Sequence, residues 1–222
     1  MHATSRPTGY TEDVAELPSS GAPPGSLRAE QVAQTRAALV VAARRLFGQH
    51  GYAATSVEDL ARAARVSTGA LYHHFPTKTA LFETVFEALH LELMTASARA
   101  ADGAPDEIEY LARGFDAFLD ALLEPDVQRI MITDAPAVLG LARFTELDER
   151  YAAVAIAEAL HGAAAAGRLH VDDPETLARL LLGVLVRGGM LIASSAEPAQ
   201  ARADVGRAVR ALLAGLAAAG GG

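Results

Sequence analysis

A cluster of small, hydroxylated and aromatic side chains at residues 67–75 of this 222-residue chain has the chemistry of a nucleic-acid contact. Residues 67–70 are Ser, Thr, Gly and Ala, which are small enough to let a backbone approach DNA, and hydroxyl groups can bond phosphates or base edges. Leu71 and Phe75 are four residues apart, so both can face a core. Tyr72 and His73 then lie on the other side, within reach of phosphates or bases.

Two short helices joined by a tight turn must position this cluster. Thr55 followed by Glu58 predicts the start of the first helix, because the pair has the spacing of a capping box. Ser67 predicts the start of the second helix, and Pro76 predicts its end. A helix-turn-helix places the first turns of its second helix in the DNA major groove, and residues 51–78 predict this layout.

The run from Ser56 to Lys78 reads S-x-x-x-L-A-x-x-A-x-V-S-x-G-x-L-Y-x-H-F-x-x-K. In this order it resembles the helix-turn-helix of the TetR family of bacterial transcriptional repressors, with Ser56 standing where that family often has Thr. Arg65 stands in the turn where the family usually has Gly. It either costs backbone strain, if its φ angle is positive, or adds a phosphate contact. Residues 129–140 resemble a stretch of one branch of the same family, without indicating a ligand.

The resemblance implies a homodimer that binds a palindromic operator in double-stranded DNA and leaves it when a small molecule enters the C-terminal domain. A cytoplasmic location is expected because a chain without Cys fits a reducing compartment. Lys78 combines a positive charge with a helix N-terminus, which suits a phosphate. The residues expected to hold phosphates are Thr55, Ser56, Tyr72 and Lys78. Those expected against base edges are Thr68, Gly69, Ala70 and His73, with Ser67 on the same surface. No cofactor and no metal ion is expected.

The N-terminal part that holds the predicted helix-turn-helix is net basic, whereas the rest of the chain is net acidic. The whole chain carries −8, but residues 28–81 carry seven Arg or Lys and three Asp or Glu, a net of +4. Residues 82–222 carry eleven basic and twenty-one acidic residues, a net of −10, and residues 1–27 carry one basic and three acidic, a net of −2. A basic segment beside an acidic one favours contact between the basic segment and phosphate.

Apolar residues at helical spacing, without β-branched alternation, predict an all-α fold of about nine helices. After a long helix that starts at Thr77, further helices are predicted at about 106–123, 126–133, 142–166, 174–194 and 198–217. We predict a disordered tail over 1–31, a DNA-binding domain over 32–92 with its motif at 55–74, and a ligand-binding and dimerisation domain over 93–222. The longest apolar stretch, 180–193, is too short to span a bilayer, so no membrane contact is expected.

The C-terminal domain is expected to hold a small apolar ligand, because ligand sites are usually apolar pockets with a few polar groups. The candidate lining residues, each of which can instead be ordinary core, are Phe86, His90, Met94, Phe115, Phe118, Met131, Asp134 and Tyr151. The last two helices carry apolar stripes that predict a four-helix dimer interface across a two-fold axis, with an intrachain core as the alternative.

The sequence argues against an enzyme. It contains no Cys, no Gly-x-Ser-x-Gly, no His-Glu-x-x-His and no phosphate-binding loop. The alternative that stays open is a helical sensor or adaptor whose head no longer binds DNA, which Arg65 and the acidic total would support. A DNA-binding repressor is favoured because residues 28–81 are net positive and the run at 67–78 is intact.

Overall fold

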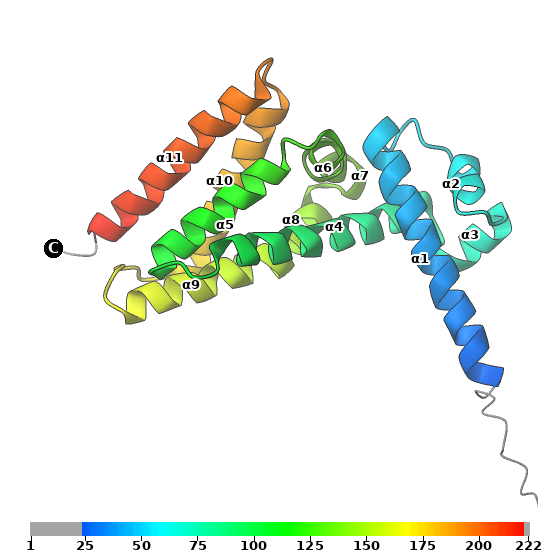
Figure 1. Ribbon diagram of the computed structural model, residues 1–222, viewed down its shortest axis with the longest axis horizontal. Helices are drawn as coiled ribbons and strands as arrows, with labels where there is room; N and C mark the ends of the chain where they lie inside the picture. Colours follow the sequence, from blue (N-terminus) through cyan, green and yellow to red (C-terminus); the bar gives the residue numbers. More distant parts are fainter. Residues whose placement is uncertain (1–23, 220–222) are drawn as a thin grey trace, which may run out of the picture. The chain divides into compact units, whose positions relative to one another are not determined.

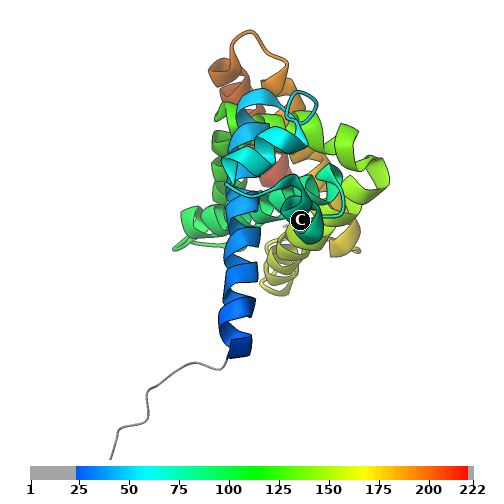
Figure 2. The ribbon, with the colours of Figure 1, turned by 90° about the vertical axis from the view of Figure 1, so that its right-hand side faces the viewer.

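The computed structural model describes residues 24–219, and these form helices joined by turns, with no strand among them (Figures 1 and 2). The chain divides into two compact units between Gln34 and Thr35. The described part of the first unit is the beginning of α1 (Pro24–His50). The second unit holds the rest of α1 and every element that follows.

Three helices precede the longest helix of the second unit. α1 is followed by α2 (Val57–Ala63), α3 (Thr68–His74) and then α4 (Lys78–Ala101). Gly51 ends α1, because its φ of 83° lies in the left-handed region and its N–H donates to the carbonyl of Phe47 at 2.8 Å. α2 and α3 therefore start from a firmly terminated helix.

The remaining elements alternate regular helix with two π-helical stretches. They are α5 (Glu107–Ala121), α6 (Pro125–Gln128), η1 (Arg129–Asp134), α7 (Ala135–Leu139), α8 (Leu141–Asp148), η2 (Glu149–Ala153), α9 (Val154–Ala165), α10 (Pro174–Ala193) and α11 (Pro198–Ala219). α6, η1 and α7 run on as one segment, and so do α8, η2 and α9. Residues 24–219 thus hold nine helical segments, and the predicted all-α fold is confirmed.

The start of α1 differs from the sequence-based expectation. A disordered tail was predicted over 1–31, but the helix begins at Pro24. Residues 27–31 are Leu, Arg, Ala, Glu and Gln, all strong helix formers, and a proline at the first helical position loses no intrahelical hydrogen bond. The rest of the predicted tail, residues 1–23, lies outside the described residues.

The cap of α2 is also one residue away from its predicted place. Ser56, not Thr55, is the N-cap: its Oγ accepts from the N–H of Asp59 at 3.0 Å, and the Asp59 carboxylate accepts from the N–H of Ser56 at 3.4 Å. Asp59 therefore takes the place predicted for Glu58 in the capping box. Hydrogen bonds from Ser56 and then Arg62 lower the pKa of Asp59. The predicted caps of the next two helices, Ser67 and Thr77, are confirmed.

The core of the second unit is built on α4, which packs along α5. Leu81, Val85 and Leu89 are fully buried on one face of α4. The long helices α10 and α11 pack against each other and are joined by the turn at the top of Figures 1 and 2. Gly188 allows this pairing, because a Cβ atom there would stand 2.7 Å from a methyl group of Val205.

Helix α10 has nearly the bounds predicted for it, 174–194, and extends beyond the apolar stretch of 180–193. It has 20 residues, and an 18-residue window reaches a mean hydropathy of 1.7, so among residues 24–219 this helix passes a test of length and composition for a membrane span. The window extends beyond residues 180–193, which alone are too short to span a bilayer. Its buried face packs in the protein core through Leu181, Leu185 and Ile192, and core helices pass the same test. The helix is thus weak evidence for a membrane span.

Candidate DNA interface and ligand pocket

Helix α3 divides its side chains between the core and the surface. Leu71 is fully buried and Phe75, the residue that ends the helix, is 2% exposed, as their spacing predicts. Tyr72 is 50% exposed and His73 is exposed. The phenol and the imidazole are thus presented to solvent from a helix anchored by its opposite face.

The beginning of α3 offers small groups. Ser67 and Gly69 are exposed, whereas Thr68 and Ala70 are half-buried. The Ser67 Oγ accepts from the N–H of Ala70 at 3.1 Å, which caps the helix. A Cβ atom on Gly69 would meet only the Ser67 Oγ, at 3.9 Å, so packing among the described residues does not require a glycine there.

Arg65 has the strained backbone that the sequence raised as one alternative. Its φ is 58°, and it is the only residue other than glycine with a positive φ within 24–219. The left-handed region costs an ordinary side chain free energy because the Cβ crowds the backbone. The side chain is exposed in the turn between α2 and α3, where its charge faces solvent. Because its side chain is exposed, Arg65 can also contact a phosphate, which was the second alternative.

Two residues predicted to hold phosphates are turned inward instead. Thr55 is 2% exposed, and its hydroxyl donates to the carbonyl of Gly51 at 2.8 Å. The Lys78 Nζ donates to the carbonyls of Tyr52 and Thr55 at 2.9 and 3.0 Å and stands 4.0 Å from the centre of the Tyr52 ring. The prediction was wrong for the Thr55 side chain. Lys78 stabilises the loop before α2 instead, because its Nζ binds the carbonyls of Tyr52 and Thr55 in that loop.

Ser56 remains at the surface. It is exposed, and its hydroxyl donates to the Asp59 carboxylate at 2.6 Å while accepting the cap bond. The outward-facing members of the predicted set are therefore Ser56, Ser67, Gly69, Tyr72 and His73. Thr68 and Ala70 lie at the edge of the same surface.

The π-helical segment η1 holds the same loop from the other side. Arg129 donates through Nη1 to the carbonyl of Gly48 at 3.1 Å and also to that of Gln49, so a positive charge caps the C-terminus of α1. The Asp134 carboxylate accepts from the N–H of Tyr52 at 2.8 Å. We call Arg129 and Asp134 the clasp. π-helical turns often occur at functional sites.

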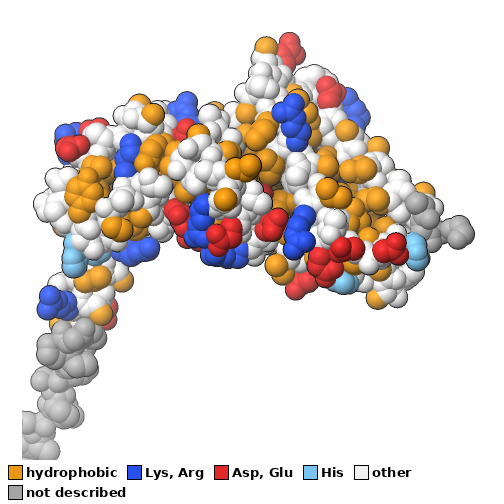
Figure 3. Space-filling model, turned by 180° about the vertical axis from the view of Figure 1, so that it is seen from behind, with side chains coloured by type: hydrophobic (Ala, Val, Ile, Leu, Met, Phe, Trp, Pro, Cys, Tyr) orange, Lys and Arg blue, Asp and Glu red, His pale blue; other side chains and the backbone are white. Residues whose placement is uncertain are grey.

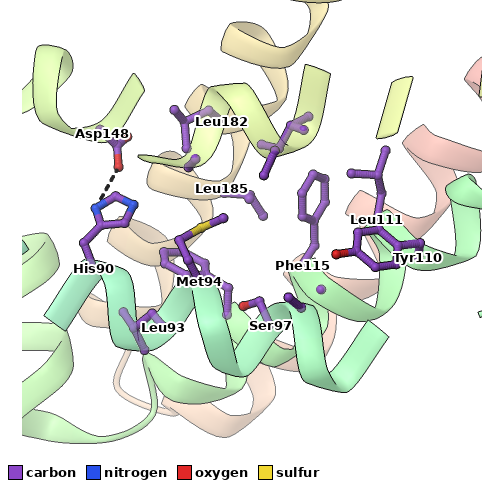
Figure 4. Close-up of a pocket in the computed structure, with 16 residues that line it drawn as sticks. His90, Leu93, Met94, Ser97, Tyr110, Leu111, Phe115, Asp148, Leu182 and Leu185 are labelled. Atoms are coloured by element: carbon purple, nitrogen blue, oxygen red, sulfur yellow. Dashed lines mark ion pairs between the residues drawn. The ribbon is translucent and has the colours of Figure 1, made fainter. Parts of the chain in front are cut away.

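A pocket of about 90 Å³ lies between α4, α5, α9 and α10 (Figure 4). Its walls are mostly apolar, with a few polar groups. The lining residues are His90, Leu93, Met94, Ser97, Ala98, Tyr110, Leu111, Gly114, Phe115, Phe118, Asp148, Ala152, Ala155, Ile156, Leu182 and Leu185. Apolar walls with few polar groups are typical of small-molecule sites.

The structure separates the predicted ligand residues into two groups. Those that line the pocket are His90, Met94, Phe115 and Phe118. Those that do not are Phe86, Met131, Asp134 and Tyr151. Phe86 and Met131 are core, Asp134 belongs to the clasp, and Tyr151 donates its hydroxyl to Glu87 at 3.3 Å. An apolar stripe on a helix does not show which of its members meet a cavity, since that depends on the helices opposite.

The pocket also contains Tyr110 and two polar residues that were not predicted from the sequence, Ser97 and Asp148. Asp148 lies in the acidic run 146–149, which is typical of a solvated helix face. The only signal was its spacing of four from Phe144, which is buried and shares its helix face.

His90 and Asp148 meet at one end of the pocket. The Nδ1 of His90 and the Oδ1 of Asp148 are 3.7 Å apart, and the side chains are 3% and 12% exposed. Burial lowers the pKa of His90 to about 4 and raises the pKa of Asp148 to about 7, with the charge of Glu149 adding to the second shift. At 3.7 Å the attraction does not offset the loss of hydration, so both groups are uncharged in mildly acidic solution.

The outer face of α10 and α11 is apolar. Leu180, Val184, Leu191 and Leu212 are exposed, and together with Gly183 they line a shallow groove. A Cβ atom on Gly183 would meet nothing within 4 Å. Figure 3 shows hydrophobic side chains gathered on this side of the molecule, above a row of acidic ones. We call this surface the α10–α11 face.

Two family models and several known proteins match this chain. Residues 39–85 match the family model "Bacterial regulatory proteins, tetR family", and residues 108–216 match "Tetracyclin repressor-like, C-terminal domain". A solved TetR-family transcriptional regulator from Pectobacterium atrosepticum is 34% identical, with 85% of this chain and 96% of that chain covered and a TM-score of 0.76. The transcriptional repressor Rv1474c from Mycobacterium tuberculosis is 28% identical, with 79% of this chain and 91% of that protein covered.

Other matches are confined to part of the chain. The regulator TtgR from Pseudomonas putida is 38% identical over 82 residues, which cover 37% of this chain and 38% of that protein. The chain thus spans less than half the length of that curated relative. These relatives are transcriptional regulators and not enzymes, in line with the sequence analysis. Both domain matches and the near-complete match to a solved regulator show that the chain belongs to the TetR family of bacterial regulatory proteins.

Proposed function

We propose that this protein is a cytoplasmic repressor that binds a palindromic operator as a homodimer and leaves it when a small molecule enters the pocket. The observation that carries the proposal is the division of α3, where Leu71 and Phe75 are buried while Tyr72 and His73 face solvent. A recognition helix must be anchored on one side and free on the other. DNA-binding and C-terminal domains over 32–92 and 93–222 are part of the proposal.

Contacts divide into those that position and those that specify. Tyr72 and Ser56 hold phosphates, and His73 lies against base edges together with the small residues 68–70. Thr55 and Lys78 act indirectly, because they fix the loop that precedes α2. Two copies of α3 enter half-sites about one helical turn apart, roughly 34–36 Å.

Ligand binding can reach α3 through α4 and η1. The pocket is lined by His90 and Met94 of α4, the helix that follows α3, and by Leu185 of α10. α10 touches η1, because a Cβ atom on Gly189 would stand 2.8 Å from a methyl group of Ile132. η1 in turn carries the clasp. A ligand releases DNA if it binds the DNA-incompetent state more tightly than the competent one.

The test of DNA binding is selection from a random pool of double-stranded DNA with ligand-free protein. We expect enrichment of a palindrome. With that site, Tyr72→Ala should weaken binding to all sequences and reduce its salt dependence, whereas His73→Ala should change which sequences are preferred. A folded protein that enriches no sequence would favour the sensor or adaptor that lacks DNA binding.

The test of the dimer uses the α10–α11 face. Leu180 is 63% exposed there, and we expect Leu180→Glu to give monomers and to abolish operator binding, since a buried unpaired carboxylate is costly. Leu141→Glu is the matched control, because Leu141 is 76% exposed on α8, outside that face. Light scattering after size exclusion measures both. A dimer that survives Leu180→Glu would move the interface elsewhere.

A further inference from the structure

At one end of the pocket, His90 and Asp148 face each other without forming a hydrogen bond. The His90 ring and the Asp148 carboxyl point toward one another in Figure 4, but the 3.7 Å between Nδ1 and Oδ1 is too long for a hydrogen bond. Nδ1 is the buried side-chain polar atom without a hydrogen-bond partner among the described residues. A buried polar group left unpaired costs free energy, so a ligand atom that pairs with it gains affinity.

His90 and Asp148 together offer a ligand one hydrogen-bond donor and one acceptor, whichever of the two residues carries the proton. If the proton is on Asp148, the carboxyl donates and Nδ1 accepts. If the proton is on Nδ1, the imidazole donates and the carboxylate accepts. A hydroxyl group has one proton to donate and lone pairs to accept with, so it matches both arrangements. One oxygen atom can lie about 2.8 Å from each of two atoms that are 3.7 Å apart.

The rest of the pocket limits the size and charge of the ligand. Its volume of about 90 Å³ exceeds the roughly 10–15 Å³ that one water needs and is below the roughly 150 Å³ of a cavity that holds benzene. A single ring is therefore the largest rigid body we expect, and Tyr110, 37% exposed, lies at the end away from His90. Charged groups are disfavoured because the walls are mostly apolar and offer no Lys or Arg side chain.

We propose that the pocket takes a small, uncharged, single-ring molecule with one hydroxyl group, whose oxygen lies between His90 and Asp148. The apolar body of the ligand then packs against Phe115 and Leu185, which line the middle of the cavity. This inference rests on the proposed function, because it names the ligand class of the same pocket. It adds a specific role for two residues that the fold does not otherwise need as polar groups.

The experiment measures binding to the DNA-free full chain, so that its failure and a failure of DNA binding are distinguishable. Phenol, toluene and benzoate are titrated by calorimetry or by protein NMR. Toluene has nearly the shape of phenol without its hydrogen-bonding group, and benzoate adds a charge. We expect phenol to bind about tenfold or more tightly than toluene, and benzoate more weakly than both.

Two variants locate the effect. His90→Leu removes the unpaired nitrogen and keeps an apolar side chain, so the preference for phenol over toluene should fall to about twofold or less while toluene binding is kept. If that variant does not fold, Asp148→Leu removes the other half of the pair and has the same expectation. Gly114→Ala is the control: its new methyl group meets the Ser97 carbonyl at 3.7 Å, an ordinary contact, and should weaken phenol and toluene alike.

Equal binding of phenol and toluene by the wild-type chain would overturn the proposal, and so would the failure of all three probes to bind. A preference for phenol that persists in His90→Leu would also overturn it, because the hydroxyl would then be bound by other groups. Insensitivity of both neutral probes to Gly114→Ala would place them outside the pocket and would have the same consequence.

Discussion

The α3 surface and the pocket obtain their polar groups in different ways. On α3, the exposed side chains come from one short stretch of sequence, which the buried Leu71 and Phe75 anchor in the core. In the pocket, His90 of α4 and Asp148 at the end of α8 are far apart in sequence, and they meet because α4 packs against η2, which directly follows Asp148. An exposed contact surface costs the fold little, whereas a buried polar pair lowers its stability. This difference predicts which substitutions stabilise the protein.

The largest effect is expected for Asp148→Asn in alkaline solution. Burial raises the pKa of Asp148 from 3.8 to about 7, so above pH 7 the folded state must hold a buried carboxylate that the unfolded state hydrates freely. The penalty is absent below pH 3.8, grows as the pH rises, and is complete above pH 7. At about 1.4 kcal/mol per pKa unit, removing it should raise the free energy of unfolding by about 4 kcal/mol at pH 8.

Urea unfolding at pH 8 and pH 5 measures this prediction. At pH 5 the gain should be less than half as large, because Asp148 then keeps its proton in the folded state. The effect of His90 on stability has the opposite pH dependence. Burial lowers its pKa from 6.5 to about 4, so its cost to the folded state appears as the pH falls below 6.5. Loss of stability in Asp148→Asn at both pH values would mean that the two residues form an ion pair, contrary to our interpretation.

The same difference explains what the sequence could predict. The buried positions of Leu71 and Phe75 and the caps Ser67 and Thr77 follow from local spacing and hydrogen-bonding chemistry, and all were predicted correctly. Thr55 and Ser56 are adjacent and both can cap a helix. Ser56 is the cap because the Thr55 hydroxyl donates to the carbonyls of Leu46 and Gly51 and is not available to cap α2.

Long-range contacts account for the other errors. Nothing near Lys78 in sequence indicates that the carbonyls of Tyr52 and Thr55 will take its ammonium group. Asp134 was a candidate ligand contact because a polar side chain can orient a ligand, but its carboxylate accepts from the backbone N–H of Tyr52 in the loop before α2. Asp148 escaped notice for the converse reason, since its acidic neighbours made it resemble a solvent-exposed residue.

An intermediate effect is expected at the clasp, which binds the end of α1 and the loop before α2. Arg129→Ala removes charged hydrogen bonds to the carbonyls of Gly48 and Gln49 at the end of α1, and these should be worth about 2 kcal/mol of stability. Hydrogen exchange at residues 48–56 should accelerate, and operator affinity should fall although Arg129 does not touch DNA. Arg99→Ala, an exposed arginine at the end of α4, is the control. Unchanged exchange at 48–56 would mean that Lys78 and Asp134 hold the loop without a contribution from Arg129.

A smaller effect distinguishes contact from packing on α3. Gly69→Ala should raise stability by up to about 1 kcal/mol, since alanine favours helix and nothing crowds its Cβ. DNA affinity should nevertheless fall, by about tenfold, if a DNA backbone lies against this position. Gly215→Ala, with open space around it on α11, should stabilise without affecting affinity. An affinity that rises with stability in Gly69→Ala would place DNA away from the start of α3.

The smallest effect concerns the turn before α3, where Arg65 has a φ of 58°. Arg65→Gly relieves the strained backbone but adds flexibility to the unfolded chain, so stability should rise by only about 0.5–1 kcal/mol. Arg65→Gln keeps the strain and removes the charge, so its stability should not change. If Arg65 contacts a phosphate, both variants should lose affinity equally and their salt dependence should fall by about one ion. Affinity loss in Arg65→Gly alone would show that the strained turn, not the charge, positions α3.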